Sequence, residues 1–82
     1  MIFTIPQKFI PLFWEYQGES LDLNKHNRLI IERILEKGDM EAVIWLFKEY
    51  SQNQIKNILL SSANISSITR LFWSKYFEYG KN

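Results

Sequence analysis

The chain has 82 residues, of which 46% are hydrophobic, 16% aromatic and 23% charged, and its net charge is +1. This length allows one hydrophobic core, so we expect a single helical domain over residues 1–82. The near-neutral charge excludes the basic surplus of a nucleic-acid-binding tail, and the absence of cysteine excludes disulfide bonds and cysteine-ligated metal sites. With no long apolar run and no signal-peptide pattern, the sequence predicts a cytoplasmic protein without a membrane segment.

The first half of the chain predicts an arm and two short helices. Residues 1–7 are β-like and predict an extended arm, after which Pro11 suits the first turn of a short helix. Apolar residues at helical spacing predict the next helix over 24–37, with Asp22 or Asn24 as its cap. Gly38 is expected to end this helix in a left-handed conformation, because glycine adopts positive φ without a steric penalty.

Three cap signals predict the remaining helices. Asp39 caps a helix that runs to about Tyr50, and its wide apolar stripe predicts that it is the most buried helix. Ser51, with Gln54 three residues later, predicts a helix over 52–62, and Ser66 predicts the last helix over 67–79. Because the connections are short, we expect an all-α fold, a compact bundle of four to five short helices with an extended N-terminal arm.

The residues that could act in catalysis or metal binding are better explained as surface or packing residues. His26 has no second histidine or cysteine with which to share a metal, so a surface or packing role is expected. Glu32 and Glu36 lie one helical turn apart, but basic residues alternate with them, and Arg28–Glu32 has the spacing of a helix-surface ion pair. No glycine-rich phosphate loop is present. The sequence therefore predicts no enzyme, no catalytic residues, no metal and no cofactor.

The last two predicted helices suggest one binding function, a helix-turn-helix that reads DNA. In that interpretation the second helix presents its first residues to the bases, and its basic residues neutralise phosphates. Leu60 stands where a small residue is usual, and the net charge offers no basic field. DNA binding is therefore kept as the alternative, and its candidate residues are Ser66, Ser67, Thr69, Arg70 and Lys75.

The aromatic content suggests a second binding function, association with another protein. Three Trp, four Tyr and six Phe exceed what a bundle of four short helices readily buries. Exposed Trp and Tyr residues are common anchors of protein interfaces. We therefore expect a protein partner, either a second copy or the product of a neighbouring gene, and candidate contacts at Trp14, Trp73, Tyr76 and Tyr79.

Several short runs of residues also resemble a known family. They are LFWEY at 12–16, IIERILEKGD at 30–39, WL at 45–46, FW at 72–73 and YF at 76–77. Over about residues 12–77 the chain resembles a family of small bacterial domains of unknown function, often encoded beside nucleotidyltransferase toxins of the abortive-infection type. The resemblance implies an antitoxin or accessory role in a toxin–antitoxin or phage-defence locus, and it implies no catalytic residue.

Overall fold

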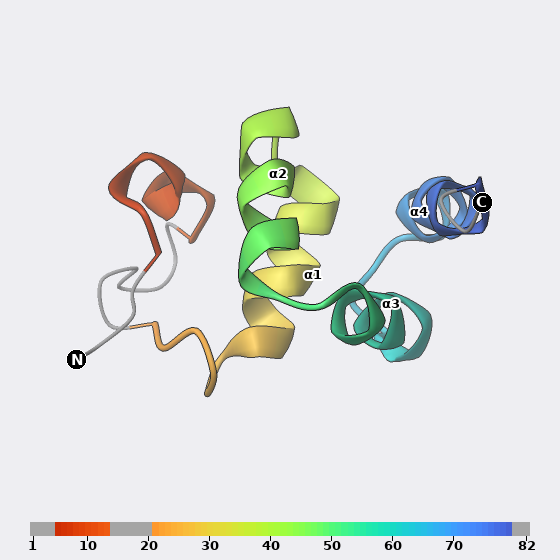
Figure 1. The fold of residues 1–82 in the computed structure, drawn as a ribbon, viewed down its shortest axis with the longest axis horizontal. Coiled ribbons are helices and arrows are strands. Elements are labelled where there is room, and N and C mark those ends of the chain that lie inside the picture. Colours follow the sequence, from red (N-terminus) through yellow and green to blue (C-terminus); the bar gives the residue numbers. More distant parts are fainter. Residues whose placement is uncertain (1–4, 14–20, 80–82) are drawn as a thin grey trace.

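The computed structural model describes residues 5–13 and 21–79, and these residues are helical without any strand (Figure 1). A 3₁₀ helix, η1 (Gln7–Phe13), precedes four α-helices. These are α1 (Asn27–Lys37), α2 (Met40–Glu49), α3 (Gln52–Ser61) and α4 (Ser67–Tyr79). The predicted all-α class is confirmed. Trp14 lies outside the described residues, as does most of the expected N-terminal arm.

Helix α1 is the centre of the bundle. It packs against η1, α2, α3 and α4, and Ile30, Ile31 and Ile34 on it are fully buried. Helices α1 and α2 lie side by side, whereas α3 and α4 are seen nearly end-on and so run across them (Figure 1). The expectation that α2 is the most buried helix is wrong, because only part of its wide apolar stripe faces α1. Ala42 and Leu46 are fully buried, while other apolar residues of α2 face outward.

The first short helix starts earlier in the chain than the sequence predicted. Helix formation starts at Gln7, four residues before Pro11, and the Phe9 N–H donates to the carbonyl of Pro6 at 2.9 Å. Ile5, Phe9 and Phe13 recur every four residues and are all buried in the core. Burial of these side chains therefore favours a helical start before Pro11, whereas residues 5 and 6 of the predicted arm are not helical.

Three of the predicted caps are confirmed. The Asp39 carboxylate accepts from the Ala42 N–H at 2.9 Å, and the Ser51 hydroxyl accepts from the Gln54 N–H at 3.1 Å. The Ser66 hydroxyl accepts from the Thr69 N–H at 3.3 Å. Helix α1 starts at Asn27, three residues later than expected. The Asp22 carboxylate accepts from the N–H groups of residues 24 and 25, so it stabilises the preceding turn instead of capping the helix.

Gly38 joins α1 to α2 without the left-handed backbone that the sequence predicted. Its φ is −75° and its ψ is 152°, an extended conformation that any residue can adopt. The requirement for glycine is steric instead. A Cβ atom at this position would lie 2.7 Å from the Ile34 carbonyl oxygen and 3.2 Å from the Ala42 Cβ.

Gly38→Val should therefore lower the free energy of unfolding by more than about 1 kcal/mol, through overpacking rather than backbone strain. Thermal denaturation measures the change. Because the close contact involves Cβ itself, Gly38→Ala should show a large part of the same loss. A melting temperature of Gly38→Ala equal to that of the wild type would contradict the steric explanation.

Candidate protein-interaction surface

A groove lined mainly by apolar side chains separates α2 from α4. It has a volume of about 670 Å³, and we call it the α2–α4 groove. Its apolar lining comprises Leu35, Met40, Val43, Ile44, Phe47, Ile68, Phe72, Trp73 and Tyr76. Several of these side chains are strongly exposed, with Met40 at 71%, Ile68 at 82% and Phe72 at 61%. Large apolar side chains from two helices thus face solvent in one contiguous patch.

An aromatic cluster forms the floor of the groove. The Phe47 ring lies 5.9 Å from the ring of Trp73, 5.8 Å from that of Tyr76 and 5.9 Å from that of Phe77. Rings at these separations attract one another beyond the area they bury. The cluster holds α4 against the end of α2, so the groove has a rigid base.

The four predicted interface residues differ in their positions and exposure in the structure. Tyr76 lies in the groove and is 48% exposed, as an interface contact requires. Trp73 is only 8% exposed, and its indole N–H donates to the Leu35 carbonyl at 3.4 Å, so it is a core residue at the floor of the groove. Trp14 and the side chain of Tyr79 lie outside the described part of the chain. Ile44 and Phe72, which the sequence did not select, are more exposed than Tyr76.

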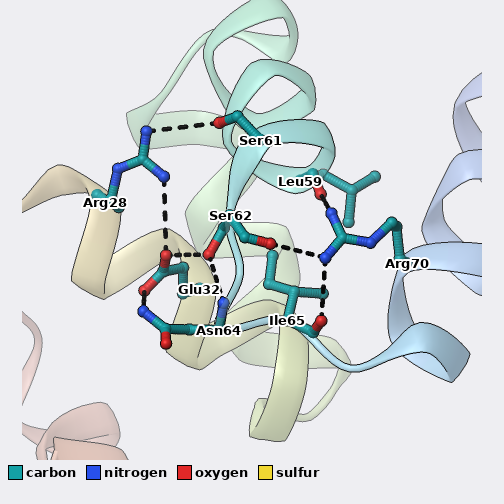
Figure 2. Close-up of polar contacts among 8 residues, drawn as sticks. All are labelled: Arg28, Glu32, Leu59, Ser61, Ser62, Asn64, Ile65 and Arg70. Atoms are coloured by element: carbon teal, nitrogen blue, oxygen red, sulfur yellow. Dashed lines mark hydrogen bonds and ion pairs between the residues drawn. The ribbon is translucent and has the colours of Figure 1, made fainter.

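Arg70 lies in the first turn of α4 and binds the protein's own backbone. Its guanidinium donates to the carbonyls of Leu59, Ser62 and Ile65, the last two at 2.6 and 3.1 Å (Figure 2). Carbonyls at a helix C-terminus have no partner within the helix, and a positive charge there is favourable. Arg70 therefore fixes the end of α3 to the start of α4, and a DNA phosphate would have to compete with these three carbonyls.

The N-terminus of α4 is bound by a carboxylate from α1. Glu36 accepts from the Ser66 N–H at 2.6 Å. Burial alone would raise the pKa of Glu36, but hydrogen bonds from Ser66 and Thr69 and the charge of Lys37 outweigh it, so the pKa is lowered. This helix end, where a recognition helix would meet phosphate, already holds an anion. Of the predicted DNA contacts, Ser66, Ser67 and Lys75 are exposed, and Ser66 is already bonded to Glu36 and Thr69.

The lowered pKa of Glu36 predicts an acid-dependent loss of stability. Because the pKa in the folded state lies below its ordinary value of 4.5, the contribution is fully present above that value. It is lost as the pH falls through the folded-state pKa. Glu36→Gln, which keeps an oxygen to accept from Ser66, should flatten the acid limb of stability against pH, as measured by urea denaturation at a series of pH values. An unchanged acid limb would contradict this assignment.

Glu32 is buried, although the sequence predicted a solvated position. It is 7% exposed; the Ser62 hydroxyl donates to its carboxylate, and the Asn64 amide lies at 3.5 Å (Figure 2). The predicted pair with Arg28 is confirmed at 3.9 Å. These contacts join α1 to the turn after α3. Only the Arg28 spacing was visible in the sequence, because Ser62 and Asn64 are brought in by tertiary packing.

His26 and Tyr50 form hydrogen bonds that stabilise the fold. The Nδ1 atom of His26 accepts from the Asp22 N–H at 2.9 Å, so His26 stabilises the turn before α1. Burial raises the pKa of the Tyr50 hydroxyl to about 12, and this hydroxyl donates to the Leu23 carbonyl at 2.6 Å.

Within residues 5–13 and 21–79, no three His, Cys, Asp or Glu side chains are grouped as metal ligands would be. None of the helices described is long and apolar enough to cross a membrane.

Comparison with known proteins identifies the family of the chain. A family of unknown function, DUF6922, has a model that matches residues 10–59, more than half of the sequence. The chain belongs to this family. The match extends from η1 into α3 and ends before α4. The α2–α4 groove therefore combines one helix inside the matched region with one outside it. No curated protein and no solved structure matches the chain.

Proposed function

We propose that this DUF6922 domain is a protein-interaction module that binds through the α2–α4 groove. The observation that carries the proposal is the exposed apolar patch on two adjacent helices, formed by Met40, Ile44, Ile68, Phe72 and Tyr76. Contiguous exposed apolar patches on small proteins mark interaction sites, whereas single exposed apolar residues are ordinary.

Burial of the patch supplies the energy for association. Removing apolar surface from water contributes roughly 25 cal/mol per Å², and Phe and Tyr side chains offer large areas with few rotatable bonds. Phe72 and Tyr76 lie one helical turn apart on α4, over a floor fixed by the Phe47 and Trp73 rings. A partner would thus meet a preorganised surface, which reduces the entropy lost on binding.

The biological setting that we propose is an antitoxin or accessory role in a bacterial toxin–antitoxin or phage-defence locus, in the cytoplasm. The support is the resemblance to domains encoded beside nucleotidyltransferase toxins, together with a surface suited to binding rather than to catalysis. The protein would act by binding to the toxin or by assembling with it.

The test compares two glutamate variants in the same assay. Phe72→Glu places a charge in the groove, whereas Leu60→Glu places one on an exposed apolar residue of α3 outside it. Each is coexpressed with the product of the adjacent gene, and copurification and growth rescue are measured. We expect at least a tenfold loss of association for Phe72→Glu, since a desolvated charge costs more than about 1.4 kcal/mol, and little change for Leu60→Glu. Equal association of both variants with the partner would refute the role of the groove.

DNA binding by a helix-turn-helix is the second candidate. It is favoured by the order α3, short connector and α4, and by the exposed side chains of Ser67 and Lys75. The contacts of Arg70 and Ser66 with the protein itself weigh against it. We expect no gel shift with DNA of the protein's own locus at low salt. A shift that falls steeply with salt and weakens in Lys75→Ala would favour this candidate instead.

A further inference from the structure

Met40 is an oxidisable side chain on the wall of the α2–α4 groove. It is 71% exposed and lines the groove together with Ile68 and Phe72, which are also strongly exposed. Peroxides convert the thioether of methionine into a sulfoxide, which is polar and accepts hydrogen bonds. The reaction therefore changes an apolar part of the candidate binding surface into a polar one.

The rest of the chain offers few competing sites for a mild oxidant. The sequence has no cysteine, and its methionines are Met1 and Met40. Met1 lies outside the described residues. Trp73, at the floor of the groove, is only 8% exposed. Among residues 5–13 and 21–79, we therefore expect peroxide to act first at Met40.

The position of Met40 allows oxidation without loss of the fold. Met40 is the first residue of α2, and the start of this helix is fixed by the Asp39 carboxylate, which accepts from the Ala42 N–H at 2.9 Å. Its side chain is not part of the buried core. Because the sulfoxide would point into solvent, it needs no rearrangement of the packed side chains. The change in the free protein is confined to the surface of the groove.

We propose that Met40 is an oxidation-sensitive regulatory site, at which sulfoxide formation weakens binding of a protein partner in the α2–α4 groove. The proposal rests on the proposed function and adds a means of its regulation. Hydrogen peroxide transfers one oxygen atom to the sulfur, so an S–O bond forms and the O–O bond breaks. The sulfur loses two electrons, and the peroxide is reduced to water. A partner would then have to desolvate the sulfoxide oxygen against apolar side chains, which is unfavourable. Methionine sulfoxide reductases reverse the change.

The test compares the wild-type chain with Met40→Leu, which keeps an apolar side chain of similar size but cannot be oxidised at this position. Both are treated with hydrogen peroxide, and mass spectrometry of the peptide that contains residue 40 measures the gain of one oxygen. Affinity for the product of the adjacent gene is then measured. We expect the oxidised wild type to bind about tenfold more weakly, and treated Met40→Leu to bind as before treatment. Reduction by sulfoxide reductases should restore the affinity of the wild type. Unchanged affinity of wild type that is fully oxidised at Met40 would overturn the proposal, as would an equal loss in Met40→Leu.

A readout without the partner separates this proposal from the proposed function. Anilinonaphthalene sulfonate fluoresces when it binds exposed apolar surface. Phe72→Glu should lower this fluorescence without peroxide, which would place the dye in the groove. Peroxide should lower it in the wild type and leave it unchanged in Met40→Leu. If the untreated wild type fails to bind the adjacent gene product, the proposed function fails, and the dye still decides whether oxidation of Met40 weakens binding in the groove. Equal fluorescence of oxidised and untreated wild type would overturn the regulatory role of Met40.

Discussion

Arg70→Ala should lower the free energy of unfolding by about 2–4 kcal/mol. The substitution removes a charged donor from three backbone carbonyls at the end of α3 and in the connector to α4. Hydrogen bonds to charged groups are worth about 1.5–3 kcal/mol each, but they share one side chain and are not additive. Urea denaturation measures the change.

Lys75→Ala is the matched control, since Lys75 is a basic residue on the same helix and is exposed. Its effect should stay within about 0.5 kcal/mol. Arg70→Lys should recover only part of the loss, because an ammonium group lacks the planar fork that serves several carbonyls at once. If Arg70→Ala and Lys75→Ala are equally stable, Arg70 does not hold the turn, and its availability for DNA would have to be reconsidered.

The starts of α2, α3 and α4 were predictable because their signals are local. Asp39, Ser51 and Ser66 each accept from an N–H three residues later, a contact that the sequence alone specifies. The role of Arg70 depends instead on carbonyls five to eleven residues earlier in the chain, which become neighbours only when the connector folds. Glu32 was misplaced for the same reason, since its partner Ser62 is thirty residues away.

The candidate surface was predictable in kind but not residue by residue. The excess of aromatic residues predicts that some of them lie exposed, and the exposed Phe72 and Tyr76 agree with that expectation. Apolar residues surround so much of α4 that the sequence does not show which side meets α1. The structure turns Trp73 inward and leaves its neighbour Phe72 outward, and only tertiary packing makes that choice.

Trp73→Ala should cost about 3–5 kcal/mol of folding free energy, the range typical of deleting a buried large aromatic side chain. Trp73 is 8% exposed, and its ring lies 5.1 Å from those of Phe72 and Tyr76 and 5.9 Å from that of Phe47. Its removal would open a cavity where α4 meets α1 and α2. For a chain of 82 residues this is a large part of the total stability.

Phe72→Ala provides the contrast, because the two aromatic residues are adjacent in the chain and differ mainly in burial. Phe72 is 61% exposed, so its loss should change the stability of the dilute protein by about 1 kcal/mol or less. Phe72→Ala should instead weaken association with a partner, since Phe72 contributes apolar area to the wall of the groove. Chemical denaturation at low concentration, with sedimentation of the same samples at high concentration, measures both quantities. If Trp73→Ala is as stable as the wild type, Trp73 is not part of the core, and the groove has no rigid floor on which a partner could bind.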